Sequence, residues 1–326
     1  MAKISGNRVL ILGSAMGLGE AVYQQFELGN LPSNYISAAD IQWRHAEDLH
    51  QQLKKINPTL VLNALPLDLL ESASIEPESY RNWVKWIGQW CEQQACTLIQ
   101  LSTVEVFADN EKRAFDENDI PTPESPLARE LYALEQCLPE SLTRAVLLRF
   151  AWLINTKGVN PFTQILSDLV HRGSTCIEPR LRIAPVWLDD ALRVTVTLVR
   201  QILAGADNWG IFHYASSDAC SQKEFAQQVL DSLDEILPTE AMEFTSVDSD
   251  QQNKSSAVLK CRRIRNNFGV HGRTWRQGLK SRIQFWLDSN AQANLNREDS
   301  NNNQAQAGVI TQARQETTSL CTPARG

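Results

Sequence analysis

The stretch RVLILGSAMGLGE at residues 8–20 constrains the fold more than any other part of the 326-residue chain. Its apolar run, residues 9–12, is too short for an ordinary helix and leads directly into Gly13, Gly17 and Gly19. This pattern predicts a buried strand, a tight turn and the start of a helix. Glycines at such a turn let backbone N–H groups approach a pyrophosphate that a Cβ atom would keep away. The stretch therefore predicts a phosphate-binding turn, although a strand-to-helix turn also needs glycine for purely structural reasons.

Strands and helices alternate along the rest of the chain. The predicted strands cover residues 9–12, 35–39, 60–63, 97–101 and 145–149, and the predicted helices cover residues 18–28, 47–56, 78–94, 126–138, 162–172 and 188–203. Such alternation implies a parallel sheet that is covered by helices on both faces. The expected fold class is therefore α/β, with a Rossmann-type doubly wound parallel sheet and a smaller carboxyl-terminal part.

The chain divides into three expected parts. Residues 1–150 are predicted to form an NAD(P)-binding Rossmann domain, and residues 151–287 a smaller substrate-binding part that is interleaved with it. Residues 288–326 are rich in Asn, Gln, Ser and Ala, a composition that predicts a disordered tail. Residues 259–286 carry eight Lys and Arg residues and no acidic residue, which indicates a solvated basic face or a grip for an acidic partner.

Composition excludes several classes of partner. The net charge of −7 argues against nucleic acid and against anionic membranes, because both need a basic surface. The seven cysteines are scattered, with no CxxC pair and no zinc spacing, so we expect reduced thiols, no metal site and a cytoplasmic protein. No stretch approaches the roughly 18 apolar residues of a membrane span.

Polar side chains follow two of the predicted strands. Asp40 comes about twenty residues after the glycine turn, where a dinucleotide fold often places an acidic group near the adenosine. The alternative is a surface aspartate that opens the next helix. Ser102 and Thr103 follow the strand at residues 97–101, and hydroxyls at the carboxyl end of a parallel strand are candidates for holding a substrate oxygen. The alternative for them is capping of the backbone at the strand end.

An aromatic stripe runs along the predicted helix at residues 78–94. Tyr80, Trp83, Ile87 and Trp90 recur at helical spacing. Such a stripe is more typical of a core or of a subunit contact than of a ligand site.

Eight stretches resemble the dTDP-4-dehydrorhamnose reductase family, an extended branch of the short-chain dehydrogenases/reductases, and they occur in the family's order. They are LVLNA (60–64), EPE (76–78), LSTVEVF (101–107), ENDIPTPESPL (117–127), LLRFAWL (147–153), APVWLDDAL (184–192), GIFHYAS (210–216), and RRIRNNFGV (262–270) followed by WRQGL. The GxxxGxG spacing of the glycine turn resembles this superfamily as well. The resemblance covers roughly residues 8–285 and supports the predicted fold.

The resemblance implies a function. The family binds NADPH or NADH on the amino-terminal sheet and a nucleotide-linked 4-keto-6-deoxy sugar on the smaller part, and reduces the ketone by hydride transfer. Some members depend on magnesium, and many are dimers. With the glycine turn, the resemblance implies cofactor-binding positions at Gly13, Ser14, Met16, Gly17, Leu18, Gly19, Asp40, Ile41, Asn63 and Ala64. It implies substrate-binding positions at Arg149, Trp152 and Trp187, for which a paired arginine and buried tryptophans are the alternatives.

The chain departs from the family at its proton donor. The family's chemistry needs a Tyr and a Lys four residues apart, because hydride delivery leaves an alkoxide that the Tyr must protonate while the Lys lowers its pKa and binds the ribose. Aligned without gaps, Leu127 and Leu131 stand at these positions, and the chain contains no YxxxK sequence. Tyr132 would point away from Leu127 on a helix. Ser102 and Thr103 are thus the catalytic candidates that remain.

Three functions stay open at this point. The first is a non-catalytic member that binds a cofactor or a nucleotide sugar and regulates a protein partner, as relatives of this fold do. The second is an active NAD(P)H-dependent sugar-nucleotide reductase whose proton comes from Thr103, Glu105, Tyr132 or water. The third is an oligomerisation module, such as a homodimer, that uses the helix at residues 78–94 and the basic segment at residues 259–286.

Overall fold

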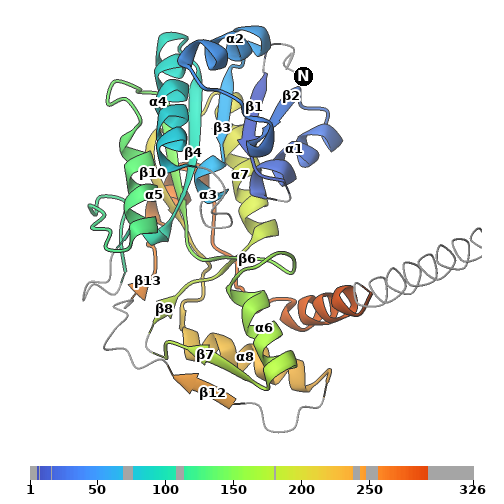
Figure 1. Ribbon diagram of the computed structural model, residues 1–326. Coiled ribbons are helices and arrows are strands. Elements are labelled where there is room, and N and C mark those ends of the chain that lie inside the picture. The colour runs from blue at the N-terminus through green and yellow to red at the C-terminus, as the bar shows by residue number, and fades with distance from the viewer. Residues whose placement is uncertain are drawn as a thin grey trace, which may run out of the picture.

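The computed structural model describes residues 6, 8–15, 17–68, 76–107, 114–179, 181–237, 243–246 and 256–292. A six-stranded parallel sheet with the strand order β10-β5-β4-β3-β1-β2 forms its centre (Figure 1). The strands are β1 (Val9–Gly13), β2 (Ser33–Ser37), β3 (Leu60–Asn63), β4 (Thr97–Thr103), β5 (Ala145–Phe150) and β10 (Gly210–Tyr214). The predicted Rossmann-type α/β fold is confirmed.

One strand lies two residues earlier than the sequence predicted. β2 ends at Ser37 because residues 38–40 turn into a short 3₁₀ helix, η1 (Ala38–Asp40). The Ser37 hydroxyl accepts a hydrogen bond from the backbone N–H of Ala39 at 3.3 Å and so caps this helix.

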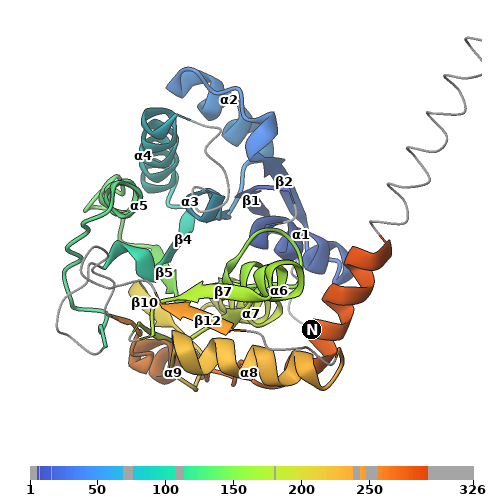
Figure 2. The same cartoon turned by 60° about the horizontal axis from the view of Figure 1, so that its bottom comes forward.

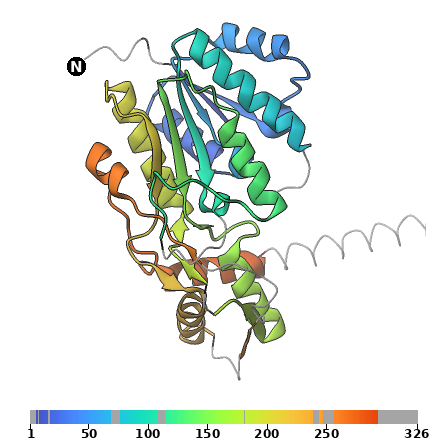
Figure 3. The ribbon, with the colours of Figure 1, turned by 90° about the vertical axis from the view of Figure 1, so that its left-hand side faces the viewer.

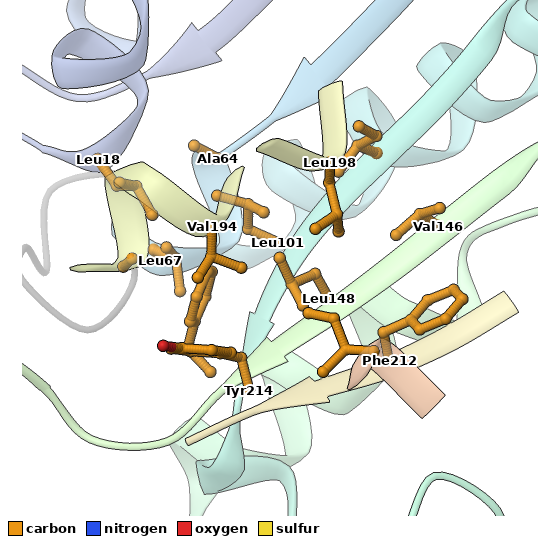
Figure 4. Close-up of a cluster of buried hydrophobic side chains, with 14 of the residues drawn as sticks. Leu18, Ala64, Leu67, Leu101, Val146, Leu148, Val194, Leu198, Phe212 and Tyr214 are labelled. Carbon is orange, nitrogen blue, oxygen red and sulfur yellow. The ribbon is translucent and has the colours of Figure 1, made fainter. Parts of the chain in front are cut away.

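Helices cover both faces of the sheet, as Figure 3 shows edge-on. α1 (Leu18–Leu28) and α7 (Leu188–Leu203) lie together on one face, and α2 (Ala46–Ile56), α4 (Pro77–Gln93) and α5 (Pro126–Gln136) lie on the other. Side chains of β1 alternate between two cores, with Val9 and Ile11 on the α1 side and Leu10 and Leu12 on the α2 side. This two-sided burial explains why the strands are apolar without interruption. Figure 4 shows the core on the α1 side, where Leu198 of α7 meets strand side chains such as Leu148.

The smaller part lies beyond the carboxyl ends of the strands (Figures 1 and 2). It contains the short helix pair α6 (Pro161–Arg172) and α8 (Gln222–Asp234) and three small sheets. Those sheets pair β7 (Ser174–Ile177) with β12 (Glu243–Ser246), β6 (Leu153–Ile154) with β9 (Val186–Trp187), and β8 (Arg182–Ile183) with both β11 (Cys220–Ser221) and β13 (Ser256–Ala257). The chain returns to the central sheet through α7 and β10. It then runs back through β11, α8, β12 and β13 of the smaller part and forms α9 (Arg262–Phe268), whose Phe268 packs on β10.

A final helix covers residues 279–292. It runs five residues past the predicted boundary at 287, since its inner face continues the smaller core through Ile283 and Trp286. The rest of the predicted tail, residues 293–326, lies outside the described residues.

The aromatic stripe of α4 belongs to the core. Tyr80, Trp83, Ile87 and Trp90 are buried against α2 and the sheet, as the core interpretation predicted. The basic segment also has a structural explanation, because Arg282, Arg276 and Lys280 pair with carboxylates at distances of 2.8 Å. No helix in the described part of the chain is long and apolar enough to cross a membrane.

A close backbone contact joins β1 to α1. A Cβ atom on Gly13 would lie 3.1 Å from the Cα of Gly19, and one on Gly19 would lie 3.2 Å from the Cβ of Ala64. These distances are closer than ordinary contacts, so glycine at both positions is required by packing between strand and helix.

We expect Gly19→Ala to lower the free energy of unfolding by about 1–3 kcal/mol, because the added methyl group meets backbone and Ala64 from three sides. Urea denaturation followed by circular dichroism measures this loss. Gly29→Ala is the matched control. The atom nearest to its methyl group would be the movable end of the Arg200 side chain at 3.1 Å, with the carbonyl oxygen of Gln25 at 3.3 Å. Equal stability of the two variants would show that α1 can move away from β1 without cost.

Candidate functional site

The candidate site begins at the carboxyl edge of the central sheet. β2, the next strand along the chain, lies on one side of β1, and β3 lies on the other side. The strand order therefore reverses between β1 and β3. Ligands of open α/β sheets bind at such a reversal. The glycine turn that follows β1 lies at this point.

Three contacts define the glycine turn. The backbone N–H of Gly17 donates to the carbonyl oxygen of Ser14 at 3.3 Å, and a Cβ atom on Gly17 would lie 2.5 Å from the Ser14 Oγ. The Tyr35 hydroxyl lies 3.0 Å from the carbonyl oxygen of Gly13 and 2.7 Å from that of Ser14, to which it donates. Tyr35 therefore turns these carbonyl groups away from the cleft. Met16, a predicted cofactor residue, lies outside the described residues.

One polar atom of the turn has no partner. The Oγ of Ser14 is buried and makes no hydrogen bond to any described residue. A buried hydroxyl without a partner costs free energy unless a ligand or water satisfies it. The turn thus has the features of a phosphate cradle: glycine where a Cβ would clash, and an unsatisfied hydroxyl.

A cleft of about 290 Å³ opens between this turn and the smaller part. Its lining residues come from the turn, the end of β3, the segment after β5 and the start of α7. They are Ala15, Gly17, Leu18, Ala64, Leu67, Leu153, Ile154, Asn155, Lys157, Gly158, Val159, Asn160 and Leu188. Of the predicted cofactor residues, this cleft brings together Gly17, Leu18 and Ala64.

The sequence analysis missed the wall formed by residues 153–160. Its Asn-Pro pair at residues 160–161 is a typical helix start, and Asn160 indeed caps α6. Nothing in the local pattern indicated that the residues before this cap face the glycine turn.

Two predicted cofactor residues, Asp40 and Ile41, lie apart from the cleft. Asp40 is exposed at the end of η1. Ile41 is buried. It lines a separate cavity of about 430 Å³ together with Trp43 and with residues of α4 such as Trp83. Asn63 is fully buried, where its amide donates to the Gln100 Oε1 at 3.3 Å.

The hydroxyls of Ser102 and Thr103 are both used inside the fold. The Ser102 Oγ donates to Glu135 Oε1 at 2.6 Å, and the Thr103 Oγ1 accepts from the backbone N–H of Glu105 at 3.4 Å. Both residues are at most 4% exposed. Thr103 thus caps the backbone at the strand end, as the structural alternative expected, whereas Ser102 bonds to the Glu135 side chain instead of the backbone.

Arg149 is the centre of a buried ion pair between β5 and α5. Its Nη2 lies 2.6 Å from Glu135 Oε2, and its Nε donates to Glu135 Oε1 at 2.9 Å. Both side chains are 2% exposed. Such a bidentate pair occupies the guanidinium with a protein carboxylate, as the paired-arginine alternative expected.

His213 of β10 completes this network. The Arg149 Nη1 lies 3.3 Å from the His213 Nε2, and since a guanidinium can only donate, this ring nitrogen accepts the bond. Burial, with the nearby charge of Arg149, lowers the pKa of His213 from 6.5 to about 3. The ring is therefore neutral in the folded chain at neutral pH.

The two predicted substrate tryptophans have different surroundings. Trp152 is half-buried after β5, and its Nε1 donates to the Glu105 carboxylate at 3.1 Å. Trp187 is buried, donates to the carbonyl oxygen of Trp275 at 2.7 Å and carries the Arg282 guanidinium 4.1 Å from its ring centre. Trp152 and Glu105 thus lie at the end of the sheet, whereas Trp187 belongs to the core of the smaller part.

On α5, Leu127 is 40% exposed and Leu131 is 1% exposed and packed in the core. Tyr132 lines a different groove of about 570 Å³, beside Gly210 and Ile211 of β10. The other tyrosines are also all described, and none of the five lines the cleft at the glycine turn. The orientation predicted for Tyr132 agrees with this placement.

The site's chemistry follows from these placements. The residues that line the cleft offer backbone groups, two amides and one ammonium group, and its remaining walls are apolar. Within the described ranges, no three His, Cys, Asp or Glu side chains are grouped to hold a metal ion. The arrangement can bind an anion beside an apolar group, but it holds no acid that points into the cleft.

Removing one member of the buried ion pair is expected to destabilise the fold strongly. Glu135→Leu leaves the Arg149 guanidinium buried without a carboxylate, so we expect a loss of about 3–5 kcal/mol in the free energy of unfolding. The double variant Glu135→Leu with Arg149→Met should recover most of this loss, because neither charge remains. Urea denaturation of both variants checks this. If the single Arg149→Met variant were as stable as the wild type, the ion pair would contribute no stability. The Arg149 side chain of the wild type would then be available for a ligand.

The pKa of His213 predicts acid sensitivity. Between pH 6.5 and about 3, the unfolded chain binds a proton at this ring that the folded chain does not, so stability falls as the pH is lowered through this window. The slope contributed by His213 is at most about 1.4 kcal/mol per pH unit. Denaturation at pH 6.5, 5.5 and 4.5 should show a smaller slope in His213→Gln, with the exposed His271→Gln as control. Identical slopes in all three proteins would contradict a buried neutral His213.

Comparison with known proteins shows which family the chain resembles in sequence. The sequence profile of the RmlD substrate binding domain matches residues 7–286. The dTDP-4-dehydrorhamnose reductase of Escherichia coli (strain K12) is 21% identical over 265 residues, which cover 78% of this chain and 89% of the relative.

Solved structures agree on the fold. A dTDP-4-dehydrorhamnose reductase from Clostridium acetobutylicum ATCC 824 matches with a TM-score of 0.71 at 18% identity, covering 85% of this chain and 99% of that chain. The dTDP-4-dehydrorhamnose reductase from Bacillus anthracis str. Ames, solved in complex with NADP, matches with a TM-score of 0.68 at 16% identity, covering 84% and 98%. Because the family profile extends over most of its length, the chain belongs to the RmlD substrate-binding-domain family, that of the dTDP-4-dehydrorhamnose reductases.

Proposed function

We propose that this chain is a non-catalytic member of its family that binds NADP or NAD, or a nucleotide sugar. Ligand binding would then regulate a protein partner. The observation that carries the proposal is the surface of α5. Leucine occupies both positions at which the family's proton donor and its supporting cation are expected, and one of them, Leu131, is packed in the core.

The placement of every tyrosine supports the absence of a substitute phenol. Tyr35 is bonded to the glycine turn and stacks on Tyr23, Tyr80 is buried in α4, and Tyr132 lines the groove beside β10. Tyr214 is bonded to Asp190, and burial raises its pKa above the ordinary value. A positioned proton donor contributes about 10²- to 10⁴-fold in rate, so its loss alone would leave little turnover.

Binding has better support than chemistry. Gly17 and the unpartnered Ser14 Oγ form a cradle that fits a pyrophosphate, and the cleft continues from it. The relative from Bacillus anthracis is solved with NADP. When bound, a nicotinamide dinucleotide would supply a hydride, while the chain's own residues would hold its phosphates and exclude water from the apolar end of the cleft.

One observation favours the second candidate, an active reductase. Glu105 places a half-buried carboxylate at the end of β4, where it accepts a hydrogen bond from Trp152. A protonated Glu105 could supply the proton that the tyrosine supplies elsewhere in the family. Thr103 is less suited, because its hydroxyl already accepts from the backbone.

A single-turnover assay decides between these candidates. With protein in excess over NADPH and the dTDP-4-keto-6-deoxy sugar, we expect the nicotinamide absorbance to fall no faster than in buffer, while cofactor fluorescence shows saturable binding. The Escherichia coli relative serves as the positive control in the same assay. Oxidation that is clearly above the buffer rate and is lost in Glu105→Gln would establish the reductase instead.

A further inference from the structure

One side chain in the cleft carries charge. Among the residues that line the cleft at the glycine turn, Lys157 is the only ionisable one. It is exposed, and within the described part of the chain its ammonium group makes no ion pair or hydrogen bond. Lys157 and Gly17 line the same cleft, so this cleft combines the glycine turn with a cation that has no counter-ion among the described residues.

The loop that carries Lys157 is held in place by Asn160. The Asn160 amide donates to the carbonyl oxygens of Asn155 at 3.0 Å and Lys157 at 3.1 Å, and its Oδ1 accepts from the backbone N–H of Phe162 at 3.1 Å. Thr163 adds a hydroxyl that donates to the carbonyl oxygen of Gly158 at 2.8 Å. The backbone of Lys157 is therefore fixed, and only its side chain must be ordered when a ligand binds, which lowers the entropic cost.

The position of Gly158 supports the same interpretation. Its φ of +70° lies in the left-handed region, which favours glycine and turns the chain sharply after Lys157. Residues 155 and 157–160 line the same cleft as Gly17, so this loop conformation accompanies the placement of Lys157 at the cleft.

We propose that Lys157 binds a phosphate oxygen of a diphosphate seated on the glycine turn, and so ties the smaller part to the central sheet through the ligand. The inference rests on the proposed function, because a diphosphate is the group that a dinucleotide and a nucleotide sugar share. An ammonium group opposite backbone N–H donors is a general arrangement for phosphate binding.

Binding measurements on the whole chain test this inference. Isothermal titration calorimetry with NADPH, with dTDP and with inorganic pyrophosphate compares the wild type, Lys157→Met and Lys157→Arg. The control is Lys223→Met, which removes an exposed lysine of α8 outside the cleft. We expect Lys157→Met to raise the Kd of the diphosphate ligand about tenfold, Lys157→Arg to stay within about threefold, and the control to match the wild type.

The ligand that loses affinity identifies the source of the diphosphate. A loss with NADPH alone assigns the cleft to the dinucleotide, and a loss with dTDP alone assigns it to the nucleotide sugar. Unchanged affinity of Lys157→Met for every ligand that the wild type binds would overturn the inference. If the wild type binds pyrophosphate in a Lys157-dependent way but neither nucleotide, the inference stands and the proposed function fails. If it binds none of the three, both fail.

Chemical footprinting gives a second readout that needs no variant. Acetylation of lysines in the wild-type protein, followed by mass spectrometry, should modify Lys157 at least fivefold more slowly when the ligand that calorimetry finds is present. The rate at Lys223 should not change. An unprotected Lys157 at saturating ligand would contradict its contact with phosphate.

Discussion

The structure depends on how closely α1 approaches β1. At Gly13 and Gly19 the two backbones are so near that a single Cβ atom on either residue would lie 3.1 Å from a Cα of the other. This contact directs the intervening turn over the carboxyl edge of the sheet, at the point where the strand order reverses. It also sets α1 beside α7, and α7 leads from the smaller part back to the sheet. The location of the cleft therefore follows from one close contact between strand and helix.

In this structure helix α5 is a packing element, with Leu131 in the core and Glu135 in a buried ion pair. Its polar interaction is directed inward, where Glu135 binds Arg149 and Ser102 beneath the helix. A buried carboxylate that is bonded in this way is fully satisfied, so the ion pair holds α5 in register without help from a ligand. The helix can then keep its place in the fold although Leu127 and Leu131 offer no proton and no charge.

The cleft is built from segments far apart in the chain. The glycine turn supplies the wall that suits a phosphate, and the loop before α6 supplies the wall with the cation. A ligand that touches both would connect the central sheet with the smaller part, whose own core, including Trp187 and Trp275, is separate. Such a connection offers a physical means by which ligand binding could be sensed.

The sequence by itself determined the strand and helix alternation, the glycine turn, the family, the loss of the Tyr-Lys pair and the inward direction of the α4 aromatic stripe. These features depend on local spacing, because the periodicities of helices and strands relate residues that are only a few positions apart in the sequence. The tertiary structure alone decided which polar side chains remain available to a ligand. Ser102 meets Glu135 across 33 residues, and Trp187 meets Trp275 across 88. Lys157 faces a turn formed about 140 residues before it. Such pairings depend on how the elements pack. The local periodicity of a sequence does not indicate which distant group will contact or hydrogen-bond a given side chain.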